Sequence, residues 1–113
     1  MTETLGLASS LRRGTLEFCV LALLDDHPRY GVGLAQELGA AGALATTEGT
    51  LYPLLSRLRR SGWVATSWQE SPAGPPRRYY TLTRDGHAAL EHFRAEWVAF
   101  RDAVDLIVGT EIR

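Results

Sequence analysis

Hydrophobic residues recur every three or four positions over three stretches of the first 62 residues, the spacing of one face of an α-helix. The pattern predicts a mostly buried helix over residues 11–26, capped by Ser9 or Ser10, and a second helix over Tyr30–Leu38. A third helix is expected to begin after Thr47, whose hydroxyl can accept a hydrogen bond from a free first-turn amide. Its inward face carries Leu51, Leu54, Leu55 and Leu58.

After Gly62, which is expected to end the third helix, the pattern changes to short runs of strand-forming residues. The segments WVATSWQ at 63–69 and RRYYTLT at 77–83 predict two strands. The proline- and glycine-rich ESPAGPP between them predicts a stiff turn. The two strands should therefore form a hairpin.

The last segment predicts one long helix, capped by Thr83 and continuing to about Val108. Its apolar residues are spaced alternately three and four apart, which is the seam of a coiled coil. Such a seam needs a partner, and a second copy of the chain is the simplest one. We therefore expect a dimerisation helix whose contact residues are Leu90, Phe93, Trp97, Phe100, Val104 and Ile107.

The expected order is three helices, a hairpin and a final helix. This order is typical of a winged helix-turn-helix, in which the third helix enters the DNA major groove. The fold class is thus mainly α with a small β-hairpin. Residues 1–83 are expected to form the DNA-binding domain and residues 84–113 the dimerisation helix.

Composition adds the class of protein. The 113 residues are 45% hydrophobic and 22% charged, as in ordinary soluble domains. No run approaches the roughly 20 apolar residues of a membrane span. The single cysteine, Cys19, cannot form an internal disulfide, so a cytoplasmic protein is expected.

Charge changes the picture through its distribution. The chain has a net charge of −1, yet residues 47–84 hold six arginines against two acids. Every one of the 12 basic residues is arginine, whose planar fork suits phosphate and guanine. This basic middle third coincides with the third helix and the hairpin.

The candidate DNA interface has two parts. The start of the third helix should read base edges, its arginines should follow the phosphate backbone, and the hairpin should meet a neighbouring groove. On the helix the candidates are Thr46, Thr47, Glu48, Gly49, Thr50, Tyr52, Pro53, Ser56, Arg57 and Arg60. On the hairpin they are Gly74, Arg77 and Arg78.

Two alternatives compete with this interface. The arginines could form a solvated face that contacts nothing, or the chain could be a winged-helix module that binds proteins or small molecules without DNA. The sequence offers no glycine-rich phosphate loop, nucleophile elbow or paired carboxylates that would indicate an enzyme. The three histidines lack the spacing of metal ligands, and no cofactor is expected.

Two motifs together resemble the PadR family of bacterial transcriptional regulators. They are TEGTLYPLLSRLRRSGWV at 47–64 and RRYYTLTRDGHAAL at 77–90. The single C-terminal helix is similar to the short, LmrR-like subfamily. The resemblance implies a homodimeric repressor that leaves a pseudo-palindromic operator when a small molecule binds. The wing tip SPAGPP departs from the family by being rich in proline.

The resemblance also implies an effector site on the last helix. In the subfamily a tryptophan at the position of Trp97 pairs with its dimer mate to stack flat aromatic drugs. The heptad alone leaves open whether Trp97 stacks a ligand or only fills the dimer seam. The candidate effector contacts are Trp97, Phe93, Phe100, Arg101, Phe18 and Leu11.

Overall fold

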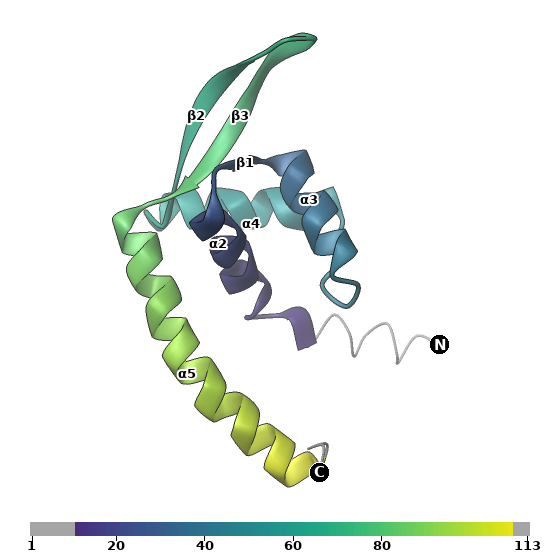
Figure 1. Ribbon diagram of the computed structural model, residues 1–113, viewed down its shortest axis with the longest axis vertical. Helices are drawn as coiled ribbons and strands as arrows, with labels where there is room; N and C mark the ends of the chain where they lie inside the picture. The colour runs from purple at the N-terminus through teal and green to yellow at the C-terminus, as the bar shows by residue number, and fades with distance from the viewer. Residues whose placement is uncertain (1–10, 110–113) are drawn as a thin grey trace.

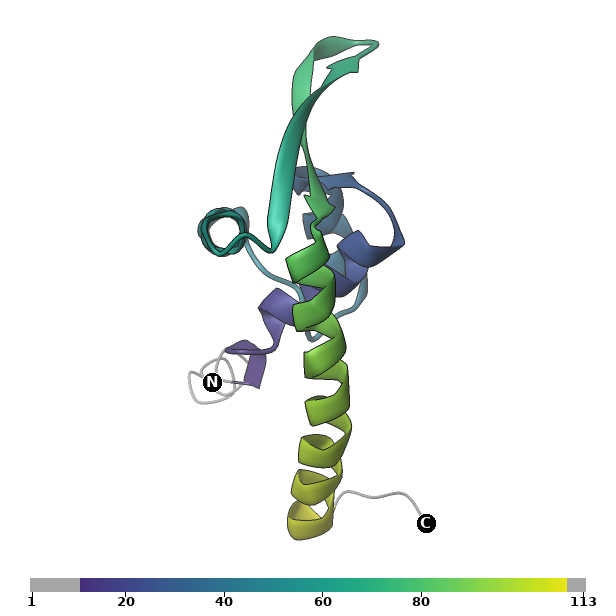
Figure 2. The same ribbon diagram turned by 90° about the vertical axis from the view of Figure 1, so that its left-hand side faces the viewer.

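The computed structural model describes residues 11–109 (Figures 1 and 2), so the proposed caps Ser9 and Ser10 lie outside the described residues. The hairpin and the last helix extend from the central body in opposite directions (Figure 1). None of the helices within 11–109 is long and apolar enough to cross a bilayer. In chain order the elements are α2 (Leu16–Asp26), β1 (Arg29–Tyr30), α3 (Gly31–Ala40), α4 (Glu48–Arg60), β2 (Val64–Ser71), β3 (Gly74–Leu82) and α5 (Arg84–Val108).

A turn interrupts the helix that the sequence predicts over residues 11–26, because Leu11 and Arg12 are helical, residues 13–15 form a turn, and α2 begins only at Leu16. The chain turns at Gly14, whose φ of +87° lies in the left-handed region that favours glycine. Thr15 precedes α2, and its hydroxyl donates to the Arg12 carbonyl at 3.1 Å. The apolar pattern runs through this turn, so the predicted single helix over 11–26 is wrong at residues 13–15.

The sheet has three strands in the order β1-β3-β2, all antiparallel. Arg29 pairs with Tyr80 and Tyr30 with Tyr79, while Val64 pairs with Leu82. β1 could not be predicted from the sequence, because two residues are too few to show alternation, and Tyr30 was expected in the second helix. Tyr30 instead ends β1 and precedes the first residue of α3.

The hairpin is longer than predicted, and the expected turn at 70–76 is wrong. β2 runs to Ser71 and β3 starts at Gly74, so only two residues lie between the strands. The pairing shifts by one residue between Gln69–Arg77 and Ser71–Gly74, so Pro75 and Pro76 lie opposite Glu70. A bulge tolerates prolines, which cannot donate to the ladder, and strand pairing therefore continues past them.

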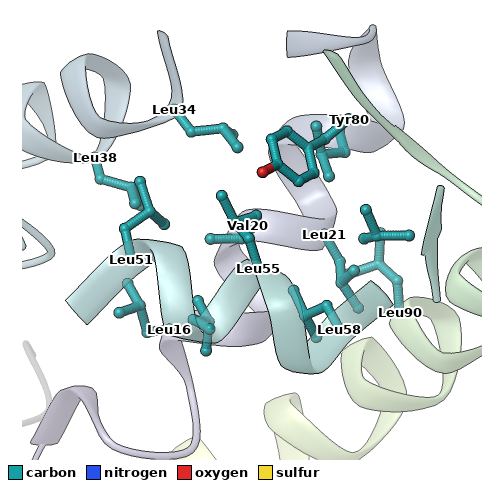
Figure 3. Packing of buried hydrophobic residues seen from close by; sticks show 13 residues of the cluster. Leu16, Val20, Leu21, Leu34, Leu38, Leu51, Leu55, Leu58, Tyr80 and Leu90 are labelled. Atoms are coloured by element: carbon teal, nitrogen blue, oxygen red, sulfur yellow. The ribbon is translucent and has the colours of Figure 1, made fainter. Parts of the chain in front are cut away.

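The core forms where α2, α3 and α4 meet one another and the sheet (Figure 3). The four predicted inward leucines of α4 are all buried, with Leu51 and Leu55 fully so. Leu90 of α5 belongs to this core and is 1% exposed. Its prediction as a dimer contact is corrected, because its own protomer already covers it. The predicted winged-helix class, with its C-terminal helix, is confirmed.

The start of α5 is fixed to the end of α4. The Thr83 hydroxyl accepts from the Gly86 amide at 3.0 Å and donates to the Gly62 carbonyl at 2.6 Å. Gly62 has a φ of +82° just after α4, as its predicted role requires. A Cβ on Gly86 would lie 2.1 Å from the Trp63 carbonyl oxygen. The helix therefore needs glycine here to pack directly on the backbone.

The Gly86→Ala substitution should reduce the free energy of unfolding by about 1–3 kcal/mol, because the backbone must move to admit the methyl group. Urea unfolding measures this. Gly33→Ala is the matched control, since an added Cβ on α3 meets no atom within 4 Å there. That control should be neutral or stabilising by up to about 1 kcal/mol. Equal stability of Gly86→Ala and the wild type would contradict the packing.

Candidate nucleic-acid interface

Helix α4 presents one face to the core and the other to solvent. Thr47 caps it as predicted, its side-chain oxygen accepting from the Thr50 amide at 3.2 Å. Thr46 is half-buried. The remaining predicted contacts on this segment are exposed: Thr47, Glu48, Gly49, Thr50, Tyr52, Pro53, Ser56, Arg57 and Arg60.

The first turns of α4 have an unusual backbone. Pro53 lies inside the helix and has no N–H, so the Gly49 carbonyl lacks its usual donor four residues later. A Cβ added to Gly49 would meet only the Thr47 hydroxyl, at 3.7 Å, and its φ is not positive. The free fold therefore does not require glycine at position 49.

Tyr52 is held by the start of α3. Its ring covers Gly31 so closely that a Cβ there would lie 2.4 Å from the phenolic oxygen. Partial burial, together with the nearby Glu48 and Tyr80, raises the pKa of Tyr52 above its ordinary value. Gly31 thus lets the Tyr52 ring pack directly on the backbone of α3.

The hairpin arginines are positioned by aromatic rings. The Arg77 guanidinium lies 4.5 Å from the centre of the Tyr30 ring, and that of Arg78 lies 5.1 Å from the centre of the Trp68 ring. Such stacking orients a guanidinium without neutralising it. A surface cleft between hairpin and helices is lined by Tyr30, Gln36, Tyr52, Arg77 and Arg78. Of the predicted contacts on α4, Tyr52 lines this cleft with the two arginines. A separate depression is lined by Thr46, Thr50, Pro53 and Arg57, and Gly74 lies at the hairpin tip.

The sequence analysis missed Trp68, which is 65% exposed on β2. Alternation along β2 gave no signal for this exposure, because Trp68 lies four residues after the buried Val64 and so shares its face of the strand.

Arg57 has a partner in the free protein. Its Nη2 lies 3.2 Å from Oε2 of Glu17 on α2. Both side chains are partly exposed, so the pair is weak and can be exchanged for another anion.

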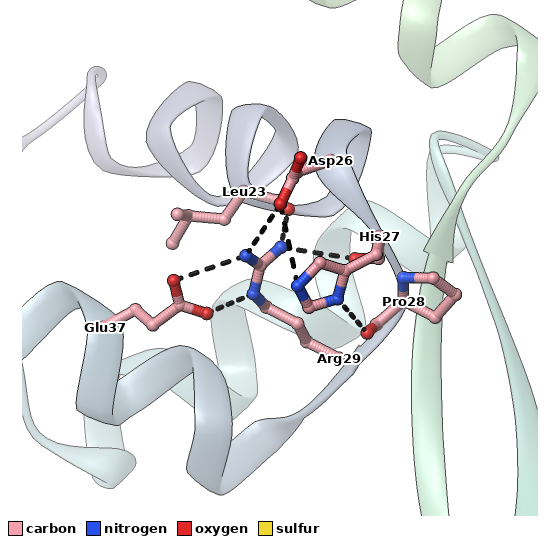
Figure 4. Close-up of polar contacts among 6 residues, drawn as sticks. All are labelled: Leu23, Asp26, His27, Pro28, Arg29 and Glu37. Atoms are coloured by element: carbon pink, nitrogen blue, oxygen red, sulfur yellow. Dashed lines mark hydrogen bonds and ion pairs between the residues drawn. The ribbon is translucent and has the colours of Figure 1, made fainter.

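The angle between α2 and α3 is set by Arg29, which is 8% exposed and which the sequence analysis did not single out (Figure 4). Its guanidinium donates to the Leu23 and His27 carbonyls and pairs with Glu37 and Asp26. An arginine in a His-Pro turn is normally expected at the surface, so no local pattern indicated this burial.

A row of aromatic rings runs from the α4–β2 junction along α5, which we call the aromatic row. Phe18 stacks on Phe93 with ring centres 4.3 Å apart and planes 3° apart. Trp63 contacts Phe18 at 5.8 Å, Phe93 contacts Trp97 at 5.8 Å, and Trp97 contacts Phe100 at 6.2 Å. The proposed effector residues Phe18, Phe93, Trp97 and Phe100 are thus brought together.

Two other effector candidates lie apart from the row. Leu11 is 69% exposed at the start of the described chain. Arg101 pairs with the neighbouring Asp102 at 3.3 Å. An apolar depression beside Phe18, Trp63 and Phe93 includes neither of them.

The second half of α5 exposes a large apolar surface. Phe100 is 63% exposed, Val104 42% and Ile107 84%. Leu106 and Val108 add exposed apolar area beyond the predicted seam. Within residues 11–109 no other element covers these side chains.

Three helices, an exposed third helix and an arginine-bearing hairpin beside it define a winged helix-turn-helix protein. The model of the Transcriptional regulator PadR-like family matches residues 20–92. A transcriptional regulator from Mycobacterium tuberculosis is 36% identical over 83 residues, covering 74% of this chain and 76% of its own.

Two solved structures agree in fold. A PadR family transcriptional regulator from Eggerthella lenta superposes with a TM-score of 0.84 at 34% identity, over 97% of this chain and 96% of its own. A PadR-like transcriptional regulator from Bacillus cereus superposes with a TM-score of 0.80 at 30% identity, over 88% of this chain and 96% of its own. The chain therefore belongs to the PadR-like family, as the two motifs predicted. The family's members are DNA-binding transcriptional regulators, typically dimeric, and not enzymes.

Proposed function

We propose that the protein is a homodimeric repressor that binds a pseudo-palindromic operator and leaves it when a planar aromatic molecule binds. The observation that carries the DNA-binding part is the cleft where Tyr52 of α4 meets the two stacked arginines of the hairpin, beside the exposed face of α4. In this proposal the DNA-binding unit comprises residues 1–83 and is completed by the first turns of α5. The protein is proposed to act in the cytoplasm.

The dimer part rests on α5. The helix has 25 residues, and its second half exposes Phe100, Val104 and Ile107 on one stripe. Exposed apolar area of this kind is costly in water and is covered by a partner helix in coiled-coil packing. A second copy related by a two-fold axis brings an identical stripe and a second α4.

The base-reading part rests on Gly49. This glycine lies exposed in the first turn of α4, where the free fold leaves room for a Cβ, and its lack of a side chain lets a partner approach the helix backbone. We infer that the α4 backbone approaches base edges at Gly49, with Thr50 and Tyr52 beside it. The phosphate backbone of the DNA is held by Arg57, Arg60, Arg77 and Arg78.

Gly49→Ala should therefore weaken operator binding by at least about tenfold, with the free energy of unfolding unchanged or raised by up to about 1 kcal/mol. Fluorescence anisotropy with a duplex selected from random DNA measures the affinity. Gly39→Ala on α3 is the matched control, because an added Cβ there also meets no atom within 4 Å. Wild-type affinity in Gly49→Ala would sink the base-reading role.

The effector part rests on the aromatic row. Phe93 and Trp97 present nearly parallel rings, 17° apart, next to an apolar depression. Flat aromatic molecules gain from offset stacking on such rings, and a dimer provides two copies of Trp97. A ligand between them would push on α5 and, through Phe18, on α2.

Titration with planar aromatic compounds should quench tryptophan emission and release the operator. The measurement uses Trp68→Phe, because that exposed wing tryptophan would otherwise obscure the signal. Adding Trp97→Ala should abolish both responses, with operator affinity in the absence of ligand retained within about threefold. Quenching that survives in the double variant would place the ligand elsewhere.

A further inference from the structure

A shallow depression lies between the start of the described chain and α4, separate from the cleft beside the hairpin. Figure 2 shows α4 end-on at one side of the body, with the purple start of the chain below it on the same side. The polar residues that line the depression are Arg12, Arg13, Glu17, Thr46, Thr50 and Arg57.

The charge of this depression is unbalanced. Three guanidinium groups line it against one carboxylate, Glu17, which pairs with Arg57 at 3.2 Å. Arg12 donates to the Ala43 carbonyl at 3.2 Å, which is not a charge partner. None of the hydrogen bonds or ion pairs found within residues 11–109 involves Arg13. The site therefore carries an excess of about two positive charges.

The depression also continues to the first turn of α4. Arg12, Thr46 and Thr50 line a second hollow together with Thr47, the residue that caps the helix. The partial positive charge of a helix start thus lies beside the arginines, with threonine hydroxyls as further donors. Charge, donors and concavity all favour a phosphate.

We propose that Arg12, Arg13 and Arg57 bind a backbone phosphate of the operator, at the edge of the groove that α4 enters. The proposal rests on the proposed DNA-binding function and adds the segment that precedes α2 to the interface. The sequence analysis placed Arg57 there but not Arg12 or Arg13.

Glu17 has a defined part in this site. In the free protein its carboxylate occupies Arg57, and a phosphate must replace it. Because Arg57 exchanges one anionic partner for another, replacing Glu17 by a DNA phosphate costs little free energy. The ion pair with Glu17 also holds the Arg57 side chain in place before DNA binds. Glu17 is thus a positioning residue that also lowers affinity for every DNA sequence alike.

The test is the salt dependence of operator binding, with the duplex selected from random DNA. Arg12→Ala/Arg13→Ala should reduce the magnitude of the slope of log K against log salt by about 1.8, since a dimer has two such sites and each lost phosphate contributes about 0.9. Arg13→Ala alone, which breaks no bond found in the free fold, should move the slope in the same direction.

Arg84→Ala is the matched control. It removes the same charge from the start of α5, where Arg84 lines a different depression with Asp25 and His87. The slope of log K against log salt for Arg84→Ala should equal that of the wild type. An unchanged slope in both Arg13→Ala and the double variant, with operator binding intact in the wild type, would overturn the phosphate site. Absence of operator binding by the wild type would instead overturn the proposed function.

Glu17→Gln gives a second readout. It should tighten binding about two- to fivefold on operator and random DNA alike, the range for an exposed ion pair. The gain should vanish when Arg57→Ala is also present. A gain that persists without Arg57 would show that Glu17 acts by general charge and would contradict the exchange.

The same arginines could bind either a backbone phosphate of DNA or a small phosphorylated molecule. Titration calorimetry with inorganic phosphate at constant ionic strength distinguishes these two ligands. A DNA phosphate site should show no binding of free phosphate below about 10 mM, because affinity comes from the whole operator. Sub-millimolar binding that Arg12→Ala/Arg13→Ala abolishes, with the DNA slope unchanged, would assign the site to a small phosphorylated molecule instead.

Discussion

The burial of one face of α4 is the constraint on which the rest of the structure depends. Leu51, Leu54, Leu55 and Leu58 are each at most 7% exposed, and each contributes roughly 1.5–3 kcal/mol by leaving water. Once these four side chains point inward, the helix has no freedom to rotate. Gly49, Tyr52 and Arg57 must then face outward, which makes the interface a direct consequence of the core.

The same helix fixes its neighbours at both ends. At its start, Tyr52 lies on Gly31 and ties α4 to α3, while Arg29 ties α3 to α2. At its end, Thr83 and Gly86 pack α5 on the α4–β2 junction. The hairpin follows from that junction, and its arginines lie on rings of Tyr30 and Trp68. The contacts of these residues therefore link α4, the hairpin and α5 to one another.

Periodicity was sufficient for the elements with strong local signals. The α4 leucines, the Thr47 and Thr83 caps and the length of α5 follow from spacing and cap chemistry alone. The errors came where tertiary contacts decide. Gly14 interrupts an apolar run because its φ is positive. β1 forms only because β3 lies beside it. Leu90 fits the heptad pattern but is buried in the core of its own protomer.

The candidate site shows the same division. The outward residues of α4 and the hairpin arginines were evident from the basic middle third, and the family motifs agreed with them. Arg12 and Arg13 carried no such signal, because only the turn at Gly14 brings them to α4. Only part of the aromatic row could be predicted from the sequence. Phe93 and Trp97 share the heptad pattern of one helix, whereas the stacking of Phe18 on Phe93 joins residues from two helices.

Selection of bound sites from random DNA tests the central claim most directly, because it measures sequence reading and dimer geometry together. A dimer that presents two copies of α4 should enrich an inverted repeat whose half-site centres lie about one helical turn, roughly 10 bp, apart. Enrichment of a single unpaired half-site, or of no sequence at all, would contradict a dimeric reader that uses α4.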